Sequence, residues 1–161
     1  MAQPIKKEIK KVHKIKKVKK TVSQGKKKHK EYGTSKLEEK FAKEFLEKLG
    51  ISYVYQYKAE SIGRFFDFYI PSANLIIEID GGWYHSDPRV LEGRELNPMQ
   101  KKNKRVDEFK NKWAISHGIP ILRIWEKDIN ETPSAVMKLL KEKLSVCSDK
   151  VKLEEEKKKR H

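Results

Sequence analysis

Residues 67–85, DFYIPSANLIIEIDGGWYH, decide the fold of this chain. The stretch begins inside an apolar segment (64–70) that carries one carboxylate, Asp67. A Pro-Ser-Ala-Asn turn (71–74) leads into a second segment (75–79) that is almost entirely apolar. β-Branched and aromatic residues around such a turn predict two antiparallel strands. The second segment has the composition of a central strand that is buried on both faces.

A helix and a further strand are predicted before this stretch. Ser35 and Glu38 have the spacing of a capping box, which marks the start of a helix. Apolar residues then recur every four positions from Leu37 to Leu49, as on the buried stripe of a helix. Residues 51–57, ISYVYQY, are β-branched and aromatic and predict a strand.

The sequence after the stretch predicts a loop over residues 86–100, a helix over 101–117 and a strand over 119–125. A last helix begins at Thr132-Pro133, because proline is favoured in the first turn. The residues expected to face the core are Val106, Phe109 and Trp113 in the first helix, and Val136, Leu139, Leu140 and Leu144 in the last.

The resulting order is α-β-β-β-α-β-α, which is an α/β fold. The strands at 75–79 and 119–125 have a helix between them, so we expect them to be parallel, with a right-handed crossover. This predicts a mixed four-stranded sheet flanked by helices. Residues 34–147 form the expected domain, and residues 148–161 form a charged tail.

The charge of the chain is concentrated at its start. The 161 residues include 38 Lys and Arg against 23 Asp and Glu, and the net charge is +15. Residues 1–33 hold 13 lysines and two glutamates, so we expect a disordered arm that contacts a polyanion. A solubilising or targeting tail, or an RNA-binding arm, is the alternative. The candidate phosphate contacts are Lys16, Lys17, Lys19, Lys20, Lys26, Lys27 and Lys28 in the arm, and Lys101, Lys102, Lys104 and Arg105 at a helix start.

Cysteine content and hydropathy exclude several protein classes. Cys147 is the only cysteine, so a disulfide framework or a Cys-rich zinc site within one chain is excluded. The sequence has no long apolar run and no signal-peptide core, so we expect a cytoplasmic protein with no membrane partner.

Several oxygen ligands fall around the predicted central strand. Asp67 and the backbone carbonyl of Ile79 lie on neighbouring antiparallel strands and are candidate ligands for Mg²⁺ or Mn²⁺, because Mg²⁺ prefers oxygen ligands and retains several waters. Asp80 is an additional candidate ligand. Glu78 and Asp80 flank Ile79 and point to one face, so one of them is a candidate ligand and the other a candidate solvated partner. Glu38 is placed to reach metal-bound water, although it also serves as the capping-box acid.

A histidine follows the acidic strand end. His85 has an intrinsic pKa near neutrality and is a candidate general base, and Asp107 on the next helix is a candidate for orienting it. An ordinary exposed ion pair is the competing interpretation of Asp107. Trp83 and Tyr84 precede the histidine; we expect them in the core, with stacking on a nucleic-acid base as the alternative.

At these residues the chain resembles the very-short-patch-repair branch of the PD-(D/E)XK, restriction-endonuclease-like nucleases. Within that branch it is most similar to the EDxHD homing endonucleases found in phage genomes. The resemblance covers residues 34–145. It is carried by Glu38 in SKLEEKF, Asp67 in FFDFYI, Ile79 in IIEIDGG, His85 in GGWYH and Asp107 in KRVDEFKN.

The resemblance implies a restriction-endonuclease-like fold and a Mg²⁺-dependent endonuclease acting on double-stranded DNA, located in the host cytoplasm if phage-encoded. It assigns Asp67 and the Ile79 carbonyl to the metal, Glu38 to metal-bound water, His85 to water activation and Asp107 to orienting His85. Asp80 stands where the repair enzymes carry a second histidine and where other PD-(D/E)XK enzymes carry a lysine. The single cysteine also departs from the structural zinc site of the repair enzymes.

Two other functions remain open at this point. One is a non-catalytic nucleic-acid-binding protein on a nuclease-like fold, and the other is a structure-specific repair nuclease. The sequence also leaves open a homodimer, the DNA target, and nicking as against double-strand cleavage.

Overall fold

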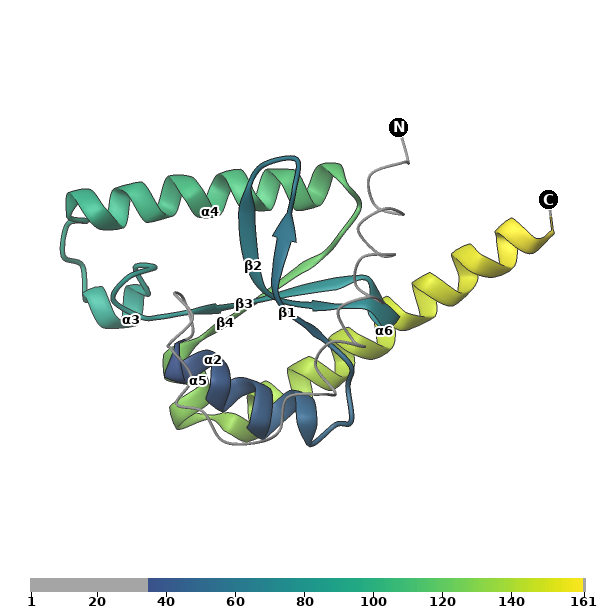
Figure 1. Ribbon diagram of the computed structural model, residues 1–161. Helices are drawn as coiled ribbons and strands as arrows, with labels where there is room; N and C mark the ends of the chain where they lie inside the picture. The colour runs from purple at the N-terminus through teal and green to yellow at the C-terminus, as the bar shows by residue number, and fades with distance from the viewer. Residues whose placement is uncertain (1–34, 161) are drawn as a thin grey trace, which may run out of the picture. The chain divides into compact units, whose positions relative to one another are not determined.

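The computed structural model describes residues 35–160, so the predicted arm over 1–33 and its candidate phosphate contacts lie outside the described residues. Figure 1 shows the arrangement of the elements. In chain order they are α2 (Lys36–Phe41), the π-helical turn η2 (Ala42–Glu47), β1 (Val54–Ala59), β2 (Arg64–Ile70), the 3₁₀ turn η3 (Pro71–Ala73), β3 (Leu75–Asp80), α3 (Pro88–Leu91), α4 (Pro98–Ser116), β4 (Ile121–Trp125), α5 (Glu126–Glu131) and α6 (Pro133–Lys159).

The four strands form one mixed sheet in the order β1-β2-β3-β4. β1 and β3 each run antiparallel to β2, whereas β3 and β4 are parallel. All residues of β3 are buried, as the composition of a central strand predicts. The predicted α-β-β-β-α-β-α order and the mixed four-stranded sheet flanked by helices are confirmed.

Two apolar layers cover the two faces of the sheet. α2, η2 and α6 contribute residues such as Phe41 and Leu140 to one layer, where they pack with Phe68. α4 contributes Trp113 and Ala114 to the other layer. The layers are visible as α4 on one side of the strands and α2 and α6 on the other (Figure 1).

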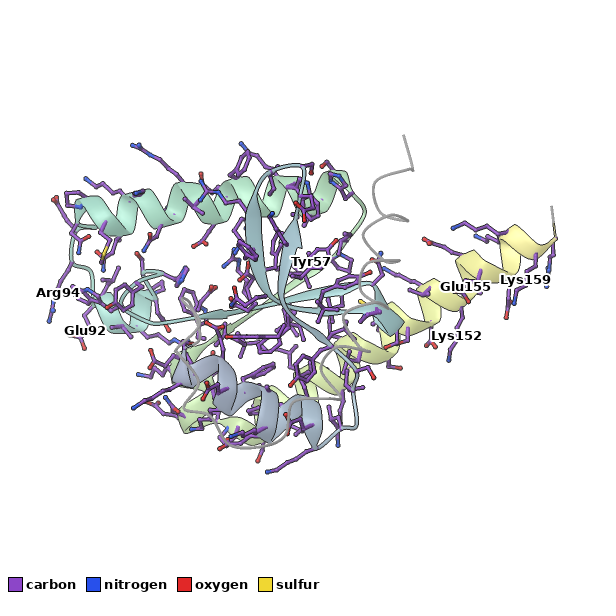
Figure 2. The ribbon with its side chains drawn as sticks, viewed as in Figure 1. Tyr57, Glu92, Arg94, Lys152, Glu155 and Lys159 are labelled. Carbon is purple, nitrogen blue, oxygen red and sulfur yellow. The ribbon has the colours of Figure 1, made fainter. Side chains whose placement is uncertain are left out.

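Helix boundaries differ from the prediction at several points. α4 begins at Pro98 rather than at residue 101, because Asn97 and Gln100 form a reciprocal capping box at its start. The short helices α3 and α5 were not predicted, and both are too short to show a helical period in sequence. α6 continues without a break to Lys159, so the predicted junction between domain and charged tail falls inside one helix. Lys152, Glu155 and Lys159 lie along its projecting end (Figure 2).

Two residues predicted to face the core are exposed. Leu139 is 46% exposed, because the buried stripe of α6 runs through Val136, Leu140 and Leu144 and Leu139 lies beside it. Phe109 is 49% exposed, because the inward side of α4 at this point is polar. Within residues 35–160, no helix has both the length and the apolar character needed to cross a bilayer.

The β1–β2 hairpin crosses from one apolar layer to the other. Tyr55 and Phe68 are paired and pack in the layer of α2 and α6. Two residues further along each strand, Tyr57 and Phe66 are paired but pack in the layer of α4 (Figure 2 labels Tyr57). Residues two apart in a regular strand lie on the same face, so the alternation is interrupted between these pairs. The residue of β2 at the interruption is Asp67.

Candidate active site

Asp67 lies where β2 and β3 diverge. Pairing between these strands ends at Phe68↔Ile77, while β3 continues alongside β4 as far as Asp80. The carboxylate of Asp67 occupies the opening, and its Oδ2 accepts a hydrogen bond of 2.7 Å from the backbone N–H of Ile79. A side chain therefore replaces the backbone acceptor that regular pairing would have supplied.

Along a β-strand the N–H and C=O of one residue point to the same side. The N–H of Ile79 bonds Asp67, so strand geometry directs the Ile79 carbonyl toward the same opening. The two candidate metal ligands predicted from sequence are thus brought to one place. They come from positions 12 residues apart, which only the hairpin makes adjacent.

Glu38 approaches this opening from α2. Its Oε2 accepts hydrogen bonds from the Tyr55 hydroxyl at 2.7 Å and from Nε2 of Gln56 at 3.0 Å. The hydrogen bonds fix the carboxylate of Glu38 on the hairpin. Burial, together with the hydrogen bond and charge of Glu38, raises the pKa of Tyr55, so its hydroxyl remains a donor at neutral pH.

Negative charge accumulates around Asp67. Burial, followed by the charges of Glu78 and Glu38, raises the pKa of Asp67 to about 8. The hydrogen bond from Ile79 and the charge of Lys110 oppose this shift without cancelling it. A cation beside Asp67 would favour its ionised form, so this half-buried acidic group is electrostatically suited to bind one.

Glu78 and Asp80 are both buried, so neither is the solvated partner that the sequence suggested for one of the two. Their side chains lie on the α4 side of β3, and each has a basic partner from a distant element. Glu78 forms an ion pair with Lys110 of α4, whose ammonium also lies 4.8 Å from the centre of the Phe66 ring. Buried charges in proteins are normally paired, which explains the two partners.

Asp80 is paired with Arg123 of β4. Nη1 of Arg123 donates to both Asp80 oxygens, at 2.7 and 2.9 Å. The guanidinium also bonds Oδ1 of Asn111 and lies 3.5 Å from Oδ1 of Asp107. Asp80 could act as a metal ligand only if Arg123 moved away. Arg123 was not among the residues predicted for the site, although an arginine within the apolar segment IPILRIW indicates a buried partner.

His85 and Asp107 form a close pair. Nδ1 of His85 lies 2.8 Å from Oδ2 of Asp107 and 3.6 Å from Oδ1 of Asp80. The hydrogen bond with Asp107 raises the pKa of His85, although burial opposes the shift. Burial would raise the pKa of Asp107, but the hydrogen bond with His85 and the charge of Arg123 lower it overall. Asp107 is therefore ionised at neutral pH, and neutral His85 carries its hydrogen on Nδ1 and a free lone pair on Nε2.

The loop that carries His85 is fixed by α4. Nε2 of Gln100 donates to the carbonyl of Trp83 at 2.8 Å, and Nδ2 of Asn103 donates to the carbonyl of Tyr84 at 3.0 Å. The side chains of Trp83 and Tyr84 are 44% and 59% exposed, so the expectation that they lie in the core is wrong. Hydrogen bonds to their backbone hold both rings at the surface beside His85.

The other end of this loop is fastened by charged groups. Arg89 bonds both Asp87, which caps α3, and Asp128 of α5. The hydrogen bonds of Arg89 lower the pKa of Asp87 despite its burial. A Cβ atom on Gly82 would lie 2.8 Å from Cγ2 of Val90, so any side chain there would require Val90 to shift. The loop therefore has little freedom to move His85.

α4 supplies most of the polar contacts of the site. Its inward stripe is polar over three turns, and this explains why Phe109 faces solvent. The outward side of the same helix carries the four predicted phosphate contacts, which are all exposed. The members of the inward stripe are Gln100, Asn103, Asp107, Lys110 and Asn111, and the exposed basic residues are Lys101, Lys102, Lys104 and Arg105.

The donor set fits a hard divalent cation that keeps most of its waters. Within the described part of the chain, no three His, Cys, Asp or Glu side chains converge into a metal site made by protein alone. Mg²⁺ does not need such a site, because one or two carboxylates, water and substrate phosphate complete its shell. Asp67 and the Ile79 carbonyl can supply two ligands, and Glu38 can bind water between them and α2.

The sequence was compared with protein-family models and with curated proteins. No protein-family model matches it, and no curated protein matches it significantly.

Proposed function

We propose that this chain is a Mg²⁺- or Mn²⁺-dependent endonuclease that hydrolyses phosphodiester bonds of double-stranded DNA. The observation that carries the proposal is the position of Asp67, a half-buried acid in a strand fork that is bonded to the backbone of Ile79. A carboxylate withdrawn from water is costly unless it has a partner, and a divalent cation would be a suitable one. The finer assignment, a homing or mobile-element nuclease, rests on the resemblance to the EDxHD enzymes.

Asp67 and the Ile79 carbonyl would hold the ion, and Glu38 would position its waters. Bound there, a divalent ion supplies positive charge for the phosphate oxygens of the transition state. The remaining chemistry is proton transfer, for which the paired His85 and Asp107 are suited.

In this scheme His85 accepts a proton at Nε2 from the water whose oxygen attacks phosphorus. The bond from phosphorus to the leaving sugar oxygen breaks, and that oxygen takes a proton from solvent water. The imidazolium that forms is stabilised by Asp107, which already accepts the hydrogen on Nδ1. Arg123 holds Asp80 and lies beside Asp107, so it keeps both acids in place.

The surface around the site supports a nucleic-acid substrate. The exposed basic residues of α4 can contact phosphates, which gives affinity without reading sequence. Trp83 and Tyr84 offer two exposed rings beside His85 that can stack on bases or enter a base step.

Cleavage of supercoiled plasmid with Mg²⁺ tests the proposal. We expect nicked or linear product with Mg²⁺ and none with EDTA, and Asp67→Ala should lower the rate by about 10³-fold. Glu38→Gln should also slow cleavage, because Glu38 would position the waters of the ion. Glu39→Gln is its matched control and should cleave like the wild type, because Glu39 is an exposed neighbour on the same helix turn. Absence of Mg²⁺-dependent cleavage, or equal cleavage by Asp67→Ala, would exclude the enzyme.

A second candidate is a non-catalytic nucleic-acid-binding protein on the same fold. The observation in its favour concerns Asp80, which stands at the position of the usual lysine of the wider nuclease group. Both carboxylate oxygens of Asp80 already accept hydrogen bonds from Arg123. This candidate requires salt-dependent binding that EDTA does not change and no turnover. A structure-specific repair nuclease would instead cut branched DNA faster than linear duplex.

A further inference from the structure

Gln56 has an unusual backbone conformation in the middle of a strand. Its φ is +52°, in the left-handed region that favours glycine and, less strongly, asparagine and aspartate. Gln56 lies in β1 between the two cross-strand pairs at which the hairpin changes layers, opposite Asp67 in β2. A costly conformation of this kind is retained where the surrounding structure depends on it.

The conformation has a direct consequence for Glu38. Because the strand turns at Gln56, both Tyr55 and Gln56 send their polar ends toward α2. There they donate to the same oxygen, Oε2 of Glu38, at 2.7 and 3.0 Å. A regular strand would place consecutive side chains on opposite faces, and the two donors could not then share one acceptor.

We propose that Tyr55 and Gln56 form a clamp that positions Glu38 beside Asp67, and that the left-handed backbone of Gln56 is retained for this purpose. Gln56 is then a positioning residue, since it acts through Glu38. The inference rests on the proposed nuclease function and assigns it two further residues.

An alternative explanation is that the turn at Gln56 serves the fold alone. Glycine would fit this backbone with less strain, and asparagine would fit it better than glutamine does. Neither has an amide that reaches as far, since glycine has none and asparagine is one methylene shorter. The presence of glutamine is therefore explained by the contact with Glu38 and not by the backbone.

The test measures stability and single-turnover plasmid cleavage for Gln56→Gly and Gln56→Asn. We expect both variants to unfold at about the temperature of the wild type, because the relieved backbone strain offsets the lost hydrogen bond to Glu38. We also expect both to cleave about tenfold more slowly, because Glu38 loses a hydrogen bond to a charged group. Simple structural damage would lower stability and rate together, so slower cleavage at unchanged stability distinguishes the clamp.

A matched control is available at Glu92, which has a φ of +49° and is exposed after α3, far along the chain from Glu38. Glu92→Gly should raise the unfolding temperature, but it should leave cleavage unchanged. Tyr55→Phe should slow cleavage without relieving strain. In a Glu38→Gln background, Gln56→Gly should have no further effect on rate, because the two residues act through one contact.

The outcomes separate the clamp from the proposed function. If the wild type cleaves and Gln56→Gly and Gln56→Asn cleave equally fast, the clamp is refuted and the nuclease stands. If Gln56→Gly slows cleavage equally in wild-type and Glu38→Gln backgrounds, Gln56 does not act through Glu38. If the wild type does not cleave with Mg²⁺, the nuclease is refuted, and the clamp's role in positioning Glu38 for catalysis is refuted with it.

Discussion

α4 and α6 cover opposite faces of one sheet, but they do so with different chemistry. α6 faces the sheet with Val136, Leu140, Leu144 and Cys147, an apolar stripe at helical spacing. α4 has apolar packing only near its end, at Trp113 and Ala114, and its earlier turns face the sheet with polar side chains that bond β3, β4 and the His85 loop. The comparison separates a layer that stabilises the fold from a layer that holds the proposed site together.

Removing the carboxylate of Asp107 should give the largest effect on the α4 side. We expect Asp107→Asn to slow cleavage by about 10³-fold, because His85 loses the acid that stabilises its charged form. Glu108→Gln, an exposed neighbour on α4, should cleave like the wild type. An Asp107→Asn rate equal to that of Glu108→Gln would show that the His85–Asp107 pair is not used.

The pH dependence of the same variants sharpens the test. A base must be neutral to accept a proton, so cleavage should rise with pH as His85 deprotonates. Because Asp107 raises the pKa of His85, the wild-type midpoint should lie above the ordinary value of 6.5. In Asp107→Asn the midpoint should move to lower pH, and an unchanged midpoint would assign the titration to another group.

A core truncation on α6 should affect stability but not chemistry. Leu140 is fully buried, so Leu140→Ala should lower the free energy of unfolding by about 3 kcal/mol in urea titrations. Leu139→Ala, the exposed neighbour, should lower it by less than about 1 kcal/mol. At a temperature where both variants are folded, each should cleave at the wild-type rate, and a rate loss in either would break the division between the layers.

Asp67 should make the metal-free protein less stable at higher pH. Its folded pKa of about 8 lies above the ordinary value of 3.8, so its contribution to stability is present below pH 4 and is lost as pH rises through 8. Asp67→Asn should remove this dependence and be more stable than the wild type at pH 9 by on the order of 2 kcal/mol. Urea titrations with EDTA at pH 6 and pH 9 measure the difference, and parallel changes in both proteins would exclude Asp67 as its source.

The smallest effect concerns the basic surfaces of the two helices. Arg105→Gln on α4 should weaken DNA binding and lower the slope of log affinity against log salt by about one, because one phosphate contact is lost. Lys141→Gln on α6, also an exposed basic residue, should leave the slope unchanged. Equal slopes for the two variants would remove α4 as the DNA-facing helix.

The contrast between the helices also explains which predictions succeeded. The core stripe of α6 was largely predicted because apolar residues recur at helical spacing, and only Leu139 was misplaced. For α4 the same rule placed Phe109 in the core, where the structure has Asp107 and Lys110 instead. Periodicity identifies an inward face by its apolar residues, so it fails where the inward face is polar.

The sequence by itself determined the α-β-β-β-α-β-α order of the main elements and the central position of β3, because both depend on local composition and short-range spacing. It also supplied the candidate residues Glu38, Asp67, His85 and Asp107. Only the tertiary structure decided that Arg123 pairs with Asp80, 43 residues away, and that Lys110 pairs with Glu78. It also placed Asp67 in the fork between β2 and β3 and Gln56 opposite it, because partners and strained conformations are set by contacts between distant segments.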